Sequence, residues 1–304
     1  MIMKFAIHVG QEGLSLDELI GQVRAAAEAG LDGVYTNQLT SWDAVTLAAL
    51  AAREVPGIDV GTAVTQTYPR HPLALAGQAL TAQAASRGRF VLGVGPSHQP
   101  IIEGWFGYSY ARPARHVREY LTALGPLLRG EQVEYRGETL TAAGRVEVPG
   151  ATPPPVLLSA LGPVMLGIAG ELTDGVVTTW TTPRTTGEYI VPAVTRAASQ
   201  AGRPAPRVVT TVIVALTADP EAAVRRVADA YGMVGHLPSY RALLDRQGLT
   251  GVHETVIAGD ETTIERALRS YTDAGATELL ISPFGDLAHR ARVLDLLSSL
   301  RSHT

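Results

Sequence analysis

The chain has 304 residues, of which 46% are hydrophobic and 18% are charged, so it can bury a large core and is not a disordered chain. Its formal net charge of −4 provides no basic surface of the kind that nucleic acids require. It contains no cysteine, which excludes disulfides, thiolate metal sites and cysteine nucleophiles.

No apolar run approaches the ~18 to 20 residues that span a bilayer. Residues 1–8 enter a strand-like pattern directly, without the regions of a secretion signal. We therefore expect a cytoplasmic protein that acts on a small molecule and binds neither membranes nor nucleic acid.

Short apolar runs alternate with helical patterns along the chain, which predicts a parallel sheet with helical crossovers. Strands are expected at Lys4–Val9, Leu31–Thr36, Ile58–Val64, Phe90–Val94, Val156–Ser159, Gly175–Thr179, Val208–Ala215, Val252–Ala258 and Glu278–Ser282. Helices are expected between Ser15 and Gly30 and at Asp43–Arg53, Pro72–Ser86, Pro113–Leu128, Val164–Glu171, Gly187–Gln200, Pro220–Tyr231, Glu261–Ala274 and Leu287–Arg301. Eight or nine such units over this length predict an α/β fold, a (β/α)8 TIM barrel.

Two insertions interrupt the alternation. Between about 130 and 150 the sequence alternates around a turn at Gly137, as a β-hairpin does. Between about 232 and 250 an extra helical segment precedes the penultimate strand. No proline- or serine-rich linker divides residues 1–304, so we expect one domain. The rival fold, an open doubly wound sheet, would need a second domain to fill this length.

The run from Phe90 to Val94 has the length of a buried parallel strand and stops at Gly95-Pro96. Ser97 and His98 follow at once, where a barrel strand delivers side chains to its C-terminal mouth, the end that carries the chemistry of such enzymes. Taken alone, these residues fit a buried strand with a polar turn equally well.

Two other strand ends carry polar or small residues. The run 159–163 ends at Gly162-Pro163 before a helix, where a phosphate would meet unpaired backbone N–H groups. Thr178 and Thr179 precede Trp180 at the end of another strand. G-x-G-x-x-G after the first strand, H-E-x-x-H and G-x-S-x-G are all absent, and the histidines do not cluster with carboxylates, so we expect no metal site.

The order of four segments resembles the bacterial luciferase-like superfamily. They are Gly30-Leu-Asp-Gly-Val-Tyr35, Val60-Gly-Thr-Ala-Val64, Arg89-Phe-Val-Leu-Gly-Val-Gly95, and Pro155 to Pro163 with Thr173-Asp-Gly175. Within that superfamily, Ser97-His98-Gln-Pro to Glu103 with Arg112-Pro-Ala-Arg-His-Val-Arg-Glu119 is similar to oxidoreductases that use the deazaflavin coenzyme F420.

The resemblance implies an elaborated TIM barrel that holds its flavin or deazaflavin at the C-terminal mouth. It implies a non-prolyl cis peptide at Ala63-Val64, forming a bulge behind the central ring of the cofactor. It also implies a set of cofactor-binding residues, which are Gln38, Ala63, Val64, Thr65, Ser97, His98, Ser159, Ala160, Leu161, Gly162, Thr178 and Thr179.

Two positions depart from the sugar-phosphate dehydrogenase branch of this family. Gln38 and Leu39 stand where that branch has an Asp-His pair, and His98 stands where it has a glutamate that transfers protons. The substrate of that branch is therefore not expected here. Gln38 can hydrogen-bond a ring carbonyl but cannot act as a base, whereas His98 is the candidate catalytic residue because histidine titrates near neutral pH.

The resemblance implies hydride transfer between F420 and a small organic substrate, with reduction of an activated double bond or carbonyl as the favoured direction. One alternative is an FMN-dependent luciferase-like monooxygenase, and another is a non-catalytic F420-binding protein. Relatives commonly pair as homodimers, and the apolar helix Ala44–Ala52 fits such an interface or burial within the barrel shell. Five aromatic residues are candidates for the substrate pocket or for the core, namely Trp42, Trp105, Phe106, Tyr108 and Trp180.

Overall fold

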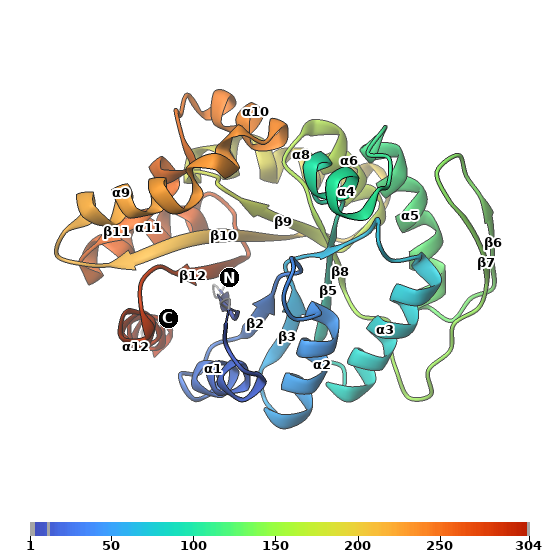
Figure 1. The fold of residues 1–304 in the computed structure, drawn as a ribbon, viewed down its shortest axis with the longest axis horizontal. Coiled ribbons are helices and arrows are strands. Elements are labelled where there is room, and N and C mark those ends of the chain that lie inside the picture. The colour runs from blue at the N-terminus through green and yellow to red at the C-terminus, as the bar shows by residue number, and fades with distance from the viewer. Residues whose placement is uncertain (1–3, 11–12, 303–304) are drawn as a thin grey trace.

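The computed structural model describes residues 4–10 and 13–302. Eight parallel strands close into a barrel, because β12 pairs with β10 on one side and with β1 on the other. The barrel strands are β1 (Lys4–His8), β2 (Gly33–Thr36), β3 (Asp59–Thr62), β5 (Phe90–Gly95), β8 (Val156–Ser159), β9 (Gly175–Thr179), β10 (Arg207–Leu216) and β12 (Glu278–Pro283). The predicted TIM barrel is therefore confirmed (Figure 1).

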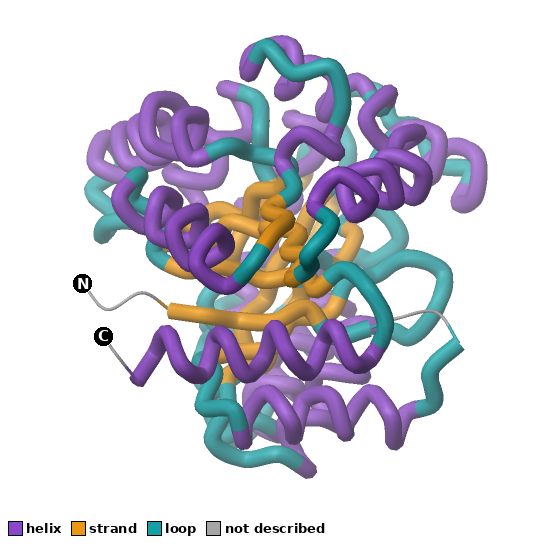
Figure 2. The backbone as a smooth tube through the Cα atoms, turned by 90° about the vertical axis from the view of Figure 1, so that its left-hand side faces the viewer, coloured by secondary structure: helices purple, strands orange, loops and turns teal. Residues whose placement is uncertain are grey.

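Helices surround the strands on the outside of the barrel (Figure 2). The crossover helices are α1 (Leu16–Glu28), α2 (Ala44–Glu54), α3 (Pro72–Ala85), α5 (Pro113–Leu128), α6 (Pro163–Leu172), α8 (Val191–Gln200), α9 (Pro220–Tyr231), α11 (Glu261–Asp273) and α12 (Leu287–Ser302). The predicted capping box at the first of them is present: Glu18 N–H donates to Ser15 Oγ, and Ser15 N–H donates to Glu18 Oε2 over 2.8 Å.

Shorter elements decorate this framework. The hairpin of β6 (Val133–Arg136) and β7 (Thr141–Gly144) lies at the outer edge beside α5 and α3 (Figure 1). The remaining pieces are β4 (Thr65–Gln66), α4 (Gln99–Phe106), α7 (Pro183–Thr185), the π-helix η1 (Thr186–Ile190), the 3₁₀ helix η2 (Gly232–His236), α10 (Pro238–Gln247), the 3₁₀ helix η3 (Val252–Thr255) and β11 (Ile257–Gly259).

The barrel interior is filled at its N-terminal end. Ala6, Tyr35, Val91, Leu157, Val177, Val209 and Leu280 form an apolar cluster inside the strands. Arg207 Nη2 donates to Glu278 Oε2 over 2.5 Å and to the Tyr35 hydroxyl over 3.0 Å. This packing fills the N-terminal end of the barrel, and the site lies toward the C-terminal ends of the strands.

Two segments differ from the sequence-based prediction. The run Val252–Ala258 was expected as one strand, but its first part is η3, because Glu254 accepts hydrogen bonds from the backbone of Thr250 and Gly251 and curls the chain. The helix α4 was not predicted, although Pro100 lies in its first turn. Proline is tolerated in the first helical turn, where its missing N–H would have no partner.

The apolar face of α2 packs inside the chain, with Leu47, Ala48, Ala51 and Ala52 all buried. Leu50 is the exposed apolar residue of this helix. Burial within the barrel shell accounts for its apolar sequence, so the helix supplies no argument for a dimer. Across the described ranges 4–10 and 13–302, every helix is too short or too polar to cross a membrane.

Candidate active site at the mouth of the barrel

A cavity of about 780 Å³ opens at the C-terminal ends of the strands. Its floor includes Val177, Thr211 and Leu280, and its outer wall comes from the helical insertion of η2 and α10. Most of the lining surface is apolar. Such a cavity, with a few polar groups converging on it, is the usual form of a small-molecule site.

The structure brings the predicted cofactor-binding residues together around this cavity, with one exception. The lining includes Gln38, Ala63, Val64, Ser97, His98, Ser159, Ala160, Leu161, Gly162, Thr178 and Thr179. Thr65 is fully buried in β4 and is not part of the lining.

The peptide bond between Ala63 and Val64 is cis, as the resemblance implied. It lies between β3 and β4, and both residues line the cavity. Ala63 N–H donates to Thr36 O over 2.7 Å, and Val64 O accepts from Gln38 N–H over 3.1 Å. These bonds tie the bulge to the end of β2, so its position is set by its neighbours.

Two glycines of β5 allow the bulge to sit close to that strand. A Cβ on Gly93 would lie 1.9 Å from the carbonyl oxygen of Thr62, and a Cβ on Gly95 would lie 2.9 Å from Val64 Cγ2. Real Cβ atoms essentially never lie so close to another atom, so a side chain at either position would displace the bulge or its neighbours. Thr62 Oγ1 reinforces the contact, since it donates to Gly93 O over 2.7 Å and accepts from Gly93 N–H over 3.0 Å.

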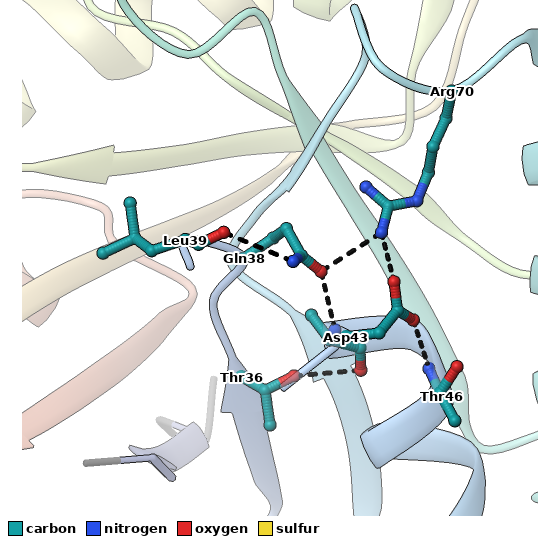
Figure 3. Close-up of polar contacts among 7 residues, drawn as sticks. Thr36, Gln38, Leu39, Asp43, Thr46 and Arg70 are labelled. Atoms are coloured by element: carbon teal, nitrogen blue, oxygen red, sulfur yellow. Dashed lines mark hydrogen bonds and ion pairs between the residues drawn. The ribbon is translucent and has the colours of Figure 1, made fainter. Parts of the chain in front are cut away.

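The amide of Gln38 is turned toward the start of α2 (Figure 3). Its Oε1 accepts from Ala44 N–H over 2.8 Å and from Arg70 Nη2 over 3.2 Å. Arg70 also pairs with Asp43, whose pKa burial would raise, but hydrogen bonds from Thr46 and the Arg70 charge bring it below its usual value. The Oε1 atom of Gln38 is thus already used within the protein. Its Nε2 donates to Leu39 O over 3.5 Å, which leaves its second N–H for a ligand (Figure 3).

His98 lies at the N-terminus of α4 and faces the helical insertion. Its Nε2 lies 3.3 Å from the Tyr240 hydroxyl, and the two rings meet edge to face at 4.9 Å between centroids. Burial lowers the pKa of His98 below its usual value and raises the pKa of Tyr240 to about 12. At neutral pH the imidazole is therefore unprotonated and the phenol is protonated.

The backbone before His98 is held in an unusual conformation. Ser97 has φ = 61°, and its carbonyl accepts a 2.7 Å hydrogen bond from the Tyr110 hydroxyl. Behind it, Tyr68 stacks on Tyr110 and on His116. This aromatic stack fixes the loop that presents Ser97 and His98 to the cavity.

Aromatic rings from the residue after β9, the end of α9 and α10 form one wall. Trp180 lines the cavity with φ = 56° and packs near Tyr231 and Tyr240. The other four aromatic candidates, Trp42, Trp105, Phe106 and Tyr108, are exposed and are not part of the lining.

The sequence analysis missed Tyr240 and His8, both of which line the cavity. Tyr240 is 142 residues from His98 in the chain, so no local pattern links them. His8 ends β1, where it was read only as a strand residue. Burial and the charge of Arg290 lower the pKa of His8 to about 4, so it is uncharged at neutral pH.

Two histidines whose pKa is lowered in the folded protein, the buried His116 and the half-buried His8, make the stability of the protein depend on pH. Burial lowers the pKa of His116 to about 4, and that of His8 likewise. The unfolded chain binds these protons near pH 6.5, so the free energy of unfolding decreases as the pH falls from about 6.5 toward 4, by roughly 2 kcal/mol per histidine at pH 5.

Urea unfolding of His116→Gln should show a smaller difference in the free energy of unfolding between pH 7 and pH 5 than the wild type shows. Replacing the exposed His236 by Gln should leave that difference unchanged. Equal pH dependence in wild type and His116→Gln would contradict this assignment.

The sequence model of the luciferase-like monooxygenase family matches residues 2–278. Among curated proteins, a putative coenzyme F420-dependent oxidoreductase, Rv3520c of Mycobacterium tuberculosis, is 32% identical over 205 residues, which is 62% of this chain and 58% of that protein. The uncharacterized protein Rv1360 of the same organism is 30% identical over 80% of this chain and 78% of its own length.

Solved structures share the fold at lower identity. The coenzyme F420-dependent tetrahydromethanopterin reductase of Methanopyrus kandleri has a TM-score of 0.83 at 21% identity, covering 98% of both chains. An FMN complex of a type II Baeyer-Villiger monooxygenase from Pseudomonas putida has a TM-score of 0.76 at 18% identity, covering 98% of this chain and 97% of that one. These likenesses are of fold, because both lie below 25% identity.

A closed eight-stranded barrel with a bulged third strand and one cavity wall built by an insertion is the architecture of a TIM-barrel enzyme scaffold. With the family match over most of its length, the chain belongs to the luciferase-like monooxygenase family.

Proposed function

We propose that this protein is a coenzyme F420-dependent oxidoreductase that transfers a hydride between the deazaflavin and a small organic substrate. The observation that carries the proposal is the cavity itself, which combines the Ala63-Val64 bulge with His98, a partly buried imidazole at its wall. The relative at 32% identity, named as a putative coenzyme F420-dependent oxidoreductase, supports the choice of cofactor.

The residues present fit an anionic deazaflavin. No aspartate or glutamate is found among the described residues that line the cavity, so a negatively charged ligand meets no like charge there. Gly162 is the N-cap of α6 and has no side chain to cap it, which leaves the N–H groups that follow Pro163 in the first turn for a phosphate. The bulge offers an apolar back to a ring. When bound, F420 supplies hydride acceptance or donation at one ring carbon.

His98 transfers the proton that accompanies the hydride. As a neutral imidazole it accepts a proton from a substrate hydroxyl during oxidation, and as an imidazolium it donates one to a carbonyl oxygen during reduction. The Tyr240 hydroxyl, 3.3 Å from Nε2, orients the ring, and Trp180 with Tyr231 excludes water from that side.

An FMN-dependent monooxygenase is the second candidate, favoured by the family match and by the likeness in fold to an FMN complex. A non-catalytic F420-binding protein is the third. Measurements of cofactor binding and of substrate turnover distinguish these three candidate functions.

Titration of the purified apo-protein with F420 and with FMN, followed by fluorescence, tests the cofactor. We expect F420 to bind at least about tenfold more tightly than FMN, a difference of roughly 1.4 kcal/mol. Preference for FMN, together with oxygen consumption in the presence of reduced flavin, would instead establish the monooxygenase. F420 binding without change of its redox state for any alcohol, carbonyl or activated alkene would favour the non-catalytic protein.

A further inference from the structure

The guanidinium of Arg246 lies at the cavity wall without an acidic partner in residues 4–10 and 13–302. Among the described residues that line the cavity, Arg246 is the one arginine or lysine, and no carboxylate accompanies it there. No ion pair or hydrogen bond joins its guanidinium to the described parts of the chain. The side chain is exposed, so it sits at the mouth and not at the floor.

The guanidinium is nonetheless held in place. Its central carbon lies 4.1 Å from the centroid of the Tyr189 ring, which also lines the cavity. Stacking uses the face of the guanidinium and leaves the N–H donors at its edges free for a planar or tetrahedral anion. The Tyr189 hydroxyl is also buried without a hydrogen-bond partner, so a second donor lies unused in the same place.

The helix that carries Arg246, α10, is fixed against the barrel by the next residue in the chain, Gln247. Gln247 is buried, its Nε2 donates to Trp180 O over 2.8 Å, and its Oε1 accepts from Thr182 N–H over 2.7 Å. These two bonds clamp the end of α10 to the loop after β9. Arg246 is therefore a preorganised cation at the mouth, which lowers the entropy cost of binding an anion.

We propose that Arg246 binds an anionic group, phosphate or carboxylate, on the side chain of the bound deazaflavin. This inference rests on the proposed function. The reacting ring belongs at the Ala63-Val64 bulge and the substrate beside His98, so a group reaching the mouth is the far end of the cofactor. Coenzyme F420 carries a phosphodiester and glutamate carboxylates there, whereas the deazaflavin with only a ribityl chain carries no charge beyond its ring.

The test compares these two ligands on three proteins by fluorescence titration at low and at high salt. Arg246→Gln should bind F420 about tenfold more weakly than wild type, the worth of one charge-assisted hydrogen-bonded contact, with a shallower salt dependence. Its affinity for the ribityl deazaflavin should be unchanged, and Arg246→Lys should recover part of the loss. The matched control is Arg225→Gln on α9, which removes the same charge from an exposed residue that pairs with Glu221 and should behave as wild type.

Equal affinity of wild type and Arg246→Gln for F420 would overturn the inference, and so would an equal loss for both ligands. A change confined to the KM of the organic substrate would also overturn it, because the arginine would then recognise the substrate. Failure of the wild type to bind either deazaflavin would refute the proposed function itself, an outcome distinct from the others.

Discussion

Replacing His98 with alanine is expected to lower kcat by about 10²- to 10³-fold, within the range of about 10²- to 10⁴-fold that a positioned acid or base contributes. The affinity for F420 should change little in comparison, because the cavity wall remains and only an imidazole is lost. Single-turnover measurement of F420 absorbance at saturating substrate, with a parallel cofactor titration, separates the two effects. A kcat within about threefold of wild type would remove His98 from proton transfer.

The proton-transfer role of His98 also predicts how the reaction rate changes with pH. Burial lowers the pKa of His98, so the neutral imidazole is the form present at pH 7. Oxidation of a hydroxyl substrate should then be fast at neutral pH and fall as the pH drops through that lowered pKa. Reduction needs the imidazolium and should fall as the pH rises through the same value. In His98→Ala this pH dependence of the rate should be absent for both oxidation and reduction.

Tyr240→Phe is the matched conservative change, because it keeps the ring that packs on His98 and removes only the hydroxyl at 3.3 Å. We expect a loss of about tenfold or less in kcat, the worth of one orienting hydrogen bond. The pH dependence of the rate should persist with a shifted midpoint, since His98 still titrates. A loss in kcat as large as that of His98→Ala, with no pH dependence, would mean that Tyr240 transfers the proton and that His98 orients Tyr240.

The barrel and the position of His98 were within reach of the sequence because both depend on local pattern. A short apolar run that ends at Gly95-Pro96 must deliver the next polar side chains to the strand end, and in a parallel barrel all strand ends meet at one mouth. The twelve positions taken from the family resemblance were correspondingly close in space, apart from Thr65, whose alternate direction in β4 buries it.

The parts that escaped prediction depend on contacts between distant segments. Tyr240 and Arg246 belong to an insertion that is held in place by hydrogen bonds from Gln247, in α10, to the loop after β9. No spacing in the sequence encodes that contact. Gln38 shows the same limit, because its Oε1 is taken by Ala44 and Arg70. Which atom of a side chain remains free is decided by tertiary partners.

Replacing Gly93 with alanine should both destabilise the protein and damage the site. The added Cβ would lie 1.9 Å from Thr62 O and 3.2 Å from Val64 Cγ1, so β3 and β5 must separate and the bulge must shift. The paired hydrogen bonds between Thr62 Oγ1 and the backbone of Gly93 would be lost with that movement. We expect a loss of about 3 kcal/mol or more in the free energy of unfolding, at the upper end for overpacked cores.

F420 affinity should fall by more than about tenfold in the same variant, because the Ala63-Val64 bulge is the proposed support of the ring and a shift of that size removes its contact. Gly167→Ala is the matched control: a Cβ there meets no atom within 4 Å, and alanine in the interior of α6 should stabilise the helix by up to about 1 kcal/mol. Thermal unfolding and F420 titration of the two variants side by side provide the measurement. A Gly93→Ala protein as stable as wild type with intact F420 binding would mean that β3 and β5 can separate freely, and the bulge would then lose its place as the fixed back of the site.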